Sequence, residues 1–305
     1  MKRRFQIQRA LTWPLLAFVL SGCGEKLPSS GPIFFEFKQQ PGDKYVYKVF
    51  DEVGWTFRDS TGKIYDTVQH VQEQKSIMKF TGIDSNAIRT VDLSFMITMD
   101  SLLSAAESSR WKKRKSPIGN KYEFELRMRA NGAIVAVNSA RPGLTLFYET
   151  AYRPSQPIFP ANAIALGYSW SQSFKVNVPQ GEPGAVEAEY KFSALEKVGD
   201  FDCAVIEFKS EVNYIEAFTP REKCEVSDCI GKYQSRTLSE GKLYFAYREG
   251  FVVKKINLLT ANSEAMITQG GATKTISRAQ QRDQETITLL AIYRSGGEKL
   301  TFAID

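Results

Sequence analysis

Few side chains in this sequence could support catalysis. A hydrolase triad needs a general base, normally histidine, and the chain contains one histidine, His70. The segment 167–171 reads Gly-Tyr-Ser-Trp-Ser and begins like the sharp turn that presents a catalytic serine, but it lacks the closing glycine. We therefore expect no catalytic residues here and interpret His70 as an exposed strand residue.

Two carboxylates at alternate positions, Glu123 and Glu125, could imitate the acid pair of a glycosidase. Arg127 and Arg129 continue the same face of an expected strand. Opposite charges on one face of a sheet pair with each other, so the pattern favours a solvated ladder of ion pairs. We expect a protein that is not an enzyme and uses no cofactor.

The cysteines suggest one disulfide and one buried thiol. Cys224 and Cys229 lie close together in a polar stretch, and so short a loop closes easily, which predicts a disulfide between them. Cys203 belongs to the apolar stretch 201–206, which predicts a buried, inert thiol. A bridge from Cys203 to either of the other two stays open as an alternative. Zinc is not expected, because His70 is far away in sequence and no fourth ligand accompanies the three thiols.

Segment 110–115 combines five positive charges with a tryptophan. Each Lys or Arg near an anionic membrane contributes about 1 kcal/mol, and tryptophan favours the membrane interface. The segment could therefore contact lipid headgroups or lipopolysaccharide phosphates, while a solvated loop between two strands is the alternative. The residues of this predicted membrane contact are Arg110, Trp111, Lys112, Lys113, Arg114 and Lys115.

Residues 1–22 have the parts of a secretory signal peptide: a basic head, an apolar stretch over 10–20, and small residues at its end. The apolar stretch is too short to span a bilayer, which needs about 20 residues. The segment carries four basic residues and no acid, so removing it lowers the formal net charge from +6 to about +2, which is 6 minus 4. An exported chain with so small a charge gives no reason to expect a nucleic-acid partner.

Residues 20–23 read Leu-Ser-Gly-Cys and resemble the bacterial lipobox, at which the cysteine is lipidated and the chain is cut just before it. The resemblance implies that Cys23 is the lipid-modified mature N-terminus, and several acyl chains together give a stable membrane anchor. Gly24 follows the cysteine and no aspartate does, a pattern that resembles proteobacterial sorting to the outer membrane. The predicted location is the bacterial cell envelope, with residues 23–31 as a short tether.

Apolar and polar residues alternate along most of the remaining chain, which is the pattern of half-buried strands. Gly-containing turns at 130–132 and 248–250 predict hairpins. The fold class is therefore mainly β, a large curved antiparallel sheet (half-barrel or sandwich-like) with one or two short helices, expected at 144–152 and, more weakly, at 101–112. The expected strands are 43–53, 64–83, 91–99, 122–128, 133–138, 168–178, 186–197, 201–217, 232–247, 251–261, 272–293 and 298–304.

We expect one antiparallel β domain over 32–305, because no long linker divides it. Three short matches recur in the same order and favour two similar halves, 42–138 and 167–258. The alternative is that a glycine followed by an aromatic residue recurs at hairpin starts in any β protein. The matched pairs are Gly42–Tyr45 with Gly167–Trp170, Gly119–Tyr122 with Gly241–Tyr244, and Gly132–Val135 with Gly250–Val253.

The segments Pro41–Tyr47 and Pro160–Trp170 resemble a group of β-rich bacterial lipoproteins that are similar to LolA-like half-barrel carriers of lipid or lipoprotein. The resemblance implies a membrane-anchored envelope lipoprotein that binds a hydrophobic ligand or lipid without catalysis, and it transfers no site residues. The alternative is a structural or assembly lipoprotein that binds another envelope protein. The aromatic content of 12% fits either a ligand lining or an ordinary core.

Overall fold

The computed structural model of the chain describes residues 31–106, 117–139, 145, 148, 153–176, 178, 181–218 and 230–303. Several predicted features lie outside these residues. They are the signal peptide with Cys23, the basic segment 110–115, the Cys224–Cys229 pair and nearly all of the helix expected at 144–152. These features stay predictions.

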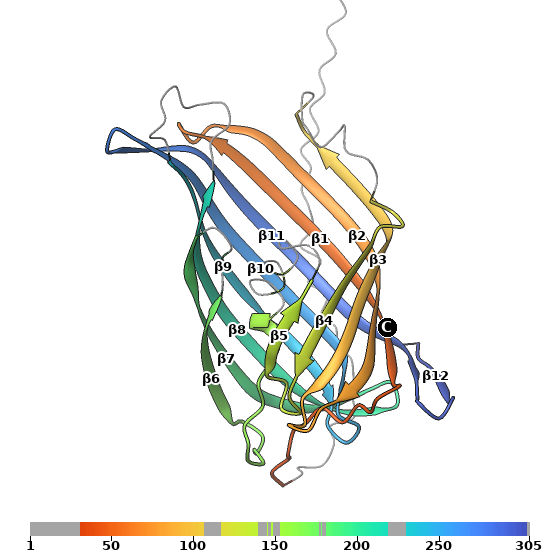
Figure 1. The fold of residues 1–305 in the computed structure, drawn as a ribbon. Coiled ribbons are helices and arrows are strands. Elements are labelled where there is room, and N and C mark those ends of the chain that lie inside the picture. Colours follow the sequence, from red (N-terminus) through yellow and green to blue (C-terminus); the bar gives the residue numbers. More distant parts are fainter. Residues whose placement is uncertain are drawn as a thin grey trace, which may run out of the picture.

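The described residues form one open, curved antiparallel sheet of twelve strands (Figure 1). Its order is β5-β4-β3-β2-β1-β11-β10-β9-β8-β7-β6, with β12 paired to β11. The prediction of a mainly β chain built on a large curved antiparallel sheet is confirmed. The strands are β1 (Lys44–Asp59), β2 (Ile64–Ile83), β3 (Arg89–Ser104), β4 (Lys121–Met128), β5 (Ile134–Asn138), β6 (Ser169–Val176), β7 (Gly181–Val198), β8 (Phe201–Phe218), β9 (Ile230–Ala246), β10 (Phe251–Gln269), β11 (Ala272–Tyr293) and β12 (Lys299–Thr301).

Two meanders share this sheet. Strands β1 to β5 follow one another on one side, strands β6 to β11 do so on the other, and β1 pairs with β11 where the two meet. Two of the three sequence matches lie at turns in both halves: Gly132 and Gly250 follow β4 and β9, and all four glycines of these two matches have positive φ. The third match differs, because Gly119 precedes β4 whereas Gly241 lies inside β9. The internal duplication itself stays a prediction.

The prediction of a helix at 101–112 is wrong for residues 101–104. Residues Ser101–Ser104 continue β3 and pair with Val68–Val71 of β2. The backbone N–H of Ala105 then donates to the carbonyl of Thr67 at 3.0 Å. A neighbouring strand that is already in place supplies partners for these backbone groups, and this outweighs a weak local helical pattern.

One end of the sheet is closed by an aromatic core, and we call it the closed end. Segment 31–40 lies against segment 153–166 through the bridge between Ile33 and Ile164, and a single 3₁₀ turn, η3 (Arg153–Ser155), begins the second segment. Phe159 stands at the centre, with its ring centroid 5.2 Å from that of Phe35 and 4.8 Å from that of Phe245. The chain itself therefore fills the hollow of the sheet at this end.

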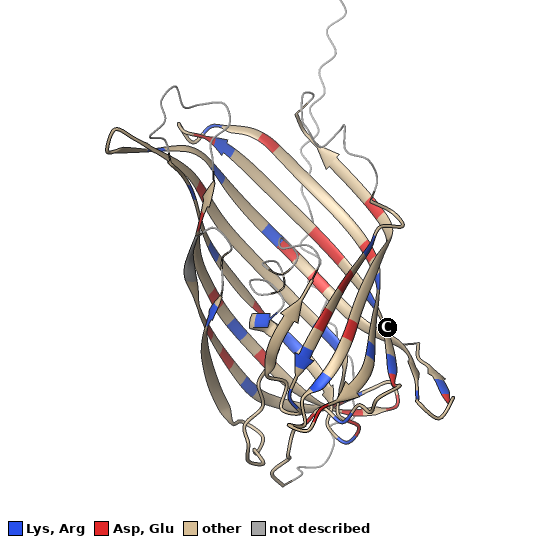
Figure 2. Cartoon of the chain, viewed as in Figure 1, with Lys and Arg blue, Asp and Glu red and all other residues tan. Residues whose placement is uncertain are grey.

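The outer face of the sheet carries charged residues in alternating rows. Glu189 lies opposite Lys209, and Glu207 lies opposite Lys242. The Lys242 Nζ and Glu207 Oε1 atoms are 3.3 Å apart, and both side chains are exposed. Acidic and basic residues are spread over many strands (Figure 2). Such a pattern suits contact with water.

None of the helices in the described residues is both long enough and apolar enough to span a membrane.

Candidate functional site: a polar belt on the inner face

The inner face changes from apolar to polar about halfway along its central strands. In β1, Tyr45, Tyr47 and Val49 point into the core, and alternation places Asp51 next on the same face. We call the polar residues at this level the inner belt. They are Asp51 of β1; His70, Gln72 and Gln74 of β2; Asp100 of β3; Ser239 of β9; Lys255 and Asn257 of β10; and Asp283 and Glu285 of β11.

Strand register brings the belt together. Asp51 lies opposite Glu285 on one side and Gln72 on the other. The same row continues to Asn257 in β10 and to Asp100 in β3. Side chains directly opposite on one face of a sheet lie about 5 Å apart, so this row forms a continuous polar strip across five strands.

The belt holds more negative than positive charge. Lys255 is 4% exposed, and its Nζ lies 3.1 Å from Glu285 Oε1. Asp51 Oδ2 accepts a hydrogen bond from Gln74 Nε2 at 3.0 Å. Asp283 Oδ1 is buried and accepts no hydrogen bond within the described ranges. One ammonium therefore serves three neighbouring carboxylates.

Burial and mutual repulsion change the acidity of this cluster. Burial, followed by the negative charge of Glu285, raises the pKa of Asp51 to about 8, although Lys255 opposes the change. The same two causes raise the pKa of Asp283 to about 7. Carboxyl groups that would otherwise be ionised thus take up protons near neutral pH. In the described part of the chain, no three His, Cys, Asp or Glu side chains are arranged to hold a metal ion.

His70 is part of the belt, so its predicted exposure is wrong. Its side chain is only 12% exposed, its Nε2 lies 2.7 Å from Asp100 Oδ1, and its ring stacks on Trp55 at 6.0 Å. Alternation along β2 turns it inward. Its cross-strand neighbours are Val53 and Leu102, so neither offers a hydroxyl or thiol to the imidazole.

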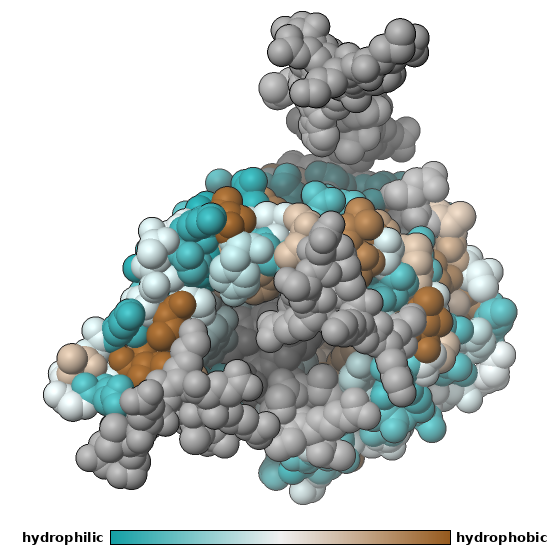
Figure 3. Space-filling view, turned by 90° about the horizontal axis from the view of Figure 1, so that it is seen from above, coloured by the Kyte–Doolittle hydropathy of each residue, from teal (hydrophilic) through white to brown (hydrophobic). Residues whose placement is uncertain are grey.

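Past the belt, away from the closed end, the inner face combines apolar residues with buried polar ones such as Ser235 and Ser263. Val68, Leu259 and Ile267 are buried there, and Tyr214 and Tyr233 have ring centroids 6.4 Å apart. We call this region the far zone. Viewed from above, hydrophobic and hydrophilic side chains alternate along the margin that the described residues form (Figure 3). Along the strands, the inner face is therefore first apolar at the closed end, then polar at the belt, and then a mixture of apolar and polar residues in the far zone.

The other residues singled out in the sequence lie away from the belt. Cys203 is a buried free thiol, as predicted, and burial raises its pKa to about 12. Glu123 accepts a hydrogen bond from Lys121 at 2.5 Å, and Arg127 pairs with Asp84. Both glutamates of β4 are exposed, but Glu125 accepts a hydrogen bond from Asn138, so the ladder with Arg127 and Arg129 stays a prediction.

Sequence reasoning missed the inner belt, although a signal was present. The odd-numbered residues of β10 read Phe251, Val253, Lys255, Asn257 and Leu259. Alternation places all five on one face, and a lysine among inward apolar residues marks a buried charge. The sequence does not show that Asp283 and Asp51 stand near this lysine.

No protein-family model and no curated protein sequence matches the chain. Among solved structures, a lipovitellin structure concerned with lipid–protein interactions is similar at 10% identity and a TM-score of 0.42, over 88% of this chain and 27% of that chain. An exported protein with a YmcC-like fold from Bacteroides fragilis is similar at 12% identity and a TM-score of 0.26, over 80% of this chain and 96% of that one. An outer membrane channel from Pseudomonas putida F1 is similar at 5% identity and a TM-score of 0.22, over 86% of this chain and 100% of that chain. At these TM-scores, no conclusion about this chain rests on the similarities.

Proposed function

We propose that this chain is a lipid-anchored protein of the bacterial envelope that binds an amphiphilic ligand, such as a lipid, inside its curved sheet without catalysis. The observation that carries the proposal is the order of chemistry along the inner face. The closed end is filled by Phe35, Phe159 and Phe245, whereas the belt and the far zone lie beyond it. The anchor on Cys23 rests on the lipobox resemblance.

An amphiphile matches this order of surfaces. Its apolar part would lie against the far zone, where burial of apolar surface contributes about 25 cal/mol per Å². Its polar end would lie at the belt, where Asp51, Asp283 and Glu285 outnumber Lys255. A hydroxyl or protonated amine at that end supplies a donor for Asp283, whose buried Oδ1 accepts no hydrogen bond in the described part of the chain.

The proposal is tested by native mass spectrometry of the protein purified without detergent from its own host. We expect co-purified lipid in the wild type and its loss in Ala261→Phe, which fills the far zone from the inner face. Thr260→Phe on the opposite face of β10 is the matched control and should retain lipid. A wild-type protein that carries no lipid contradicts the proposal.

A second candidate function is assembly with another envelope protein, and the open edges of the sheet favour it. In the described residues, β5 pairs only with β4, and β6 pairs only with β7. Unpaired strand edges can accept a strand from a partner. If a partner binds in this way, Ser173→Pro in β6 should weaken its capture, and the lipid content should not change.

A further inference from the structure

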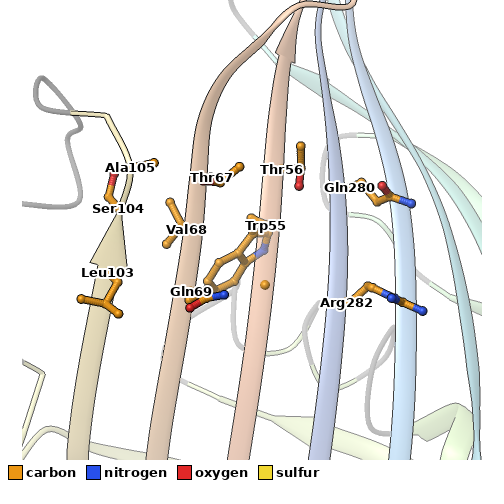
Figure 4. A pocket seen from close by; sticks show the side chains of 11 residues that line it. Trp55, Thr56, Thr67, Val68, Gln69, Leu103, Ser104, Ala105, Gln280 and Arg282 are labelled. Carbon is orange, nitrogen blue, oxygen red and sulfur yellow. The ribbon is translucent and has the colours of Figure 1, made fainter. Parts of the chain in front are cut away.

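A glycine in the middle of β1 leaves a gap on the outer face. Trp55 faces inward against His70, so alternation turns Gly54 outward. Gly54 lies opposite Arg282 of β11 on one side and opposite Gln69 of β2 on the other. A cavity of about 560 Å³ lies over this glycine (Figure 4), within the usual size range of small-molecule sites.

The walls of this groove are rich in hydrogen-bond donors. Gly54, Arg282 and Gln69 form one row across the strands. Two residues further along, the next row on the same face holds Gln280, Thr56 and Thr67. The side chains of Thr56, Thr67 and Gln69 border the gap, and those of Gln280 and Arg282 begin at its edge on β11 and extend over the neighbouring strand (Figure 4). Leu103, which is 67% exposed, forms an apolar margin on β3.

Arg282 sets the charge of the groove. It is the one charged residue among the described residues that line the cavity. It is exposed and forms no ion pair with an acid in the described part of the chain. The nearest outward acid along β1 is Glu52, which lies in the next row, opposite Gln284. The groove thus presents a positive charge that other lining residues do not neutralise.

The glycine itself serves no backbone requirement. Gly54 does not have positive φ, and a Cβ atom built on it would meet nothing within 4 Å. Glycine weakens a strand interior and often marks a place where a ligand approaches closely. This observation is independent of the charge on Arg282 and points to the same spot.

We propose that the groove over Gly54 binds the phosphate group of a phosphate ester. A guanidinium binds phosphate oxygens through two parallel hydrogen bonds. The hydroxyls of Thr56 and Thr67 and the amides of Gln69 and Gln280 supply further donors, more than the two oxygens of a carboxylate require. Leu103 contacts the apolar part of the ester. The phosphate belongs either to a lipid headgroup or to a soluble ester.

The test is calorimetric titration of the purified protein with three probes: inorganic phosphate, short-chain phosphatidic acid and acetate. We expect both phosphate probes to bind and acetate to bind much more weakly. Equal affinity for the two phosphate probes identifies a soluble phosphate as sufficient, whereas much tighter binding of phosphatidic acid identifies a lipid source.

Three variants distinguish phosphate binding in the groove from a general effect of surface charge. Arg282→Gln and Gly54→Val should each weaken phosphate binding by at least about tenfold. Valine suits a strand and has room at position 54, so Gly54→Val should fold while it fills the groove. Gly82→Val, at an equally open glycine of β2, is the matched control and should bind like the wild type.

The proposal is overturned if neither phosphate probe binds, if acetate binds as tightly as phosphate, or if Arg282→Gln retains wild-type affinity. Thermal unfolding of each variant shows that any loss of binding is not a loss of fold. A Gly54→Val variant that melts like the wild type and still binds phosphate also overturns it.

Discussion

The closed end and the inner belt occupy the same face of the same strands, yet they are built from opposite chemistry. At the closed end, the inward strand residues include Tyr45 of β1 and Phe245 of β9, and Phe245 packs against Phe35 and Phe159 of the two segments that fill the hollow. At the belt, the residues at equivalent inward positions are Asp51, Glu285 and their polar neighbours. The alternation of inward and outward residues is the same in both regions. Alternation therefore sets where a side chain points, and side-chain chemistry alone separates a core from a site.

The two regions also differ in what they contribute to stability. Buried aromatic rings gain from the removal of apolar surface from water. Buried carboxylates cost free energy unless they are paired or protonated. We infer that the closed end stabilises a sheet whose inner belt is electrostatically unfavourable, and three substitutions test this difference.

The largest effect should come from the closed end. Phe245→Ala removes a ring that is fully buried among Phe35, Phe37 and Phe159. Truncation of such a ring leaves a cavity and costs about 3–5 kcal/mol. Urea unfolding followed by circular dichroism measures the loss. A change below about 1 kcal/mol would mean that this end is not the stabilising core.

At the belt, we expect a smaller change in the free energy of unfolding, and one that stabilises the protein instead of destabilising it. The pKa of Asp51 is raised in the folded state to about 8, so this state holds a proton that the unfolded chain releases near pH 4. The stability that Asp51 contributes is therefore complete below about pH 4 and is lost as the pH rises through about 8. Asp283 contributes in the same sense, with its loss near pH 7.

Asp51→Asn should accordingly stabilise the protein relative to the wild type at pH 9 and have little effect at pH 4. Unfolding in urea at both pH values measures the difference. Glu52→Gln, on the exposed outer face of the same strand, is the matched control and should show no such dependence. An Asp51→Asn variant whose effect does not change between pH 4 and pH 9 would show that the belt holds no excess proton.

The smallest effect should come from the outer face. Glu207→Gln removes an exposed partner of Lys242. Exposed ion pairs contribute about 0–1 kcal/mol, so we expect a change within that range that decreases as salt is added. A loss comparable with that of Phe245→Ala would show that the outer ladder, and not the closed end, holds the strands in place.

Much of the strand pattern could be predicted because it is local. The alternation over 91–99 predicts part of β3, and the glycines at 132 and 250 predict two of the turns. His70 was placed in a strand correctly but on the wrong face, since one polar residue among polar neighbours does not show which side of a strand is inside. The inner belt could not be assembled, because its members come from six strands.

The sequence by itself determined the alternation of strands and the turns between several of them, since both depend on residues that are near neighbours along the chain. The location in the bacterial envelope, which the lipobox resemblance of Leu20–Cys23 implies, stays a prediction from the sequence. Only the tertiary structure decided that β1 pairs with β11, which places Asp51 opposite Glu285 and Gly54 opposite Arg282. The physical reason is that alternation defines two faces for each strand but neither its neighbour nor its register. Those follow from packing the whole sheet around the closed end.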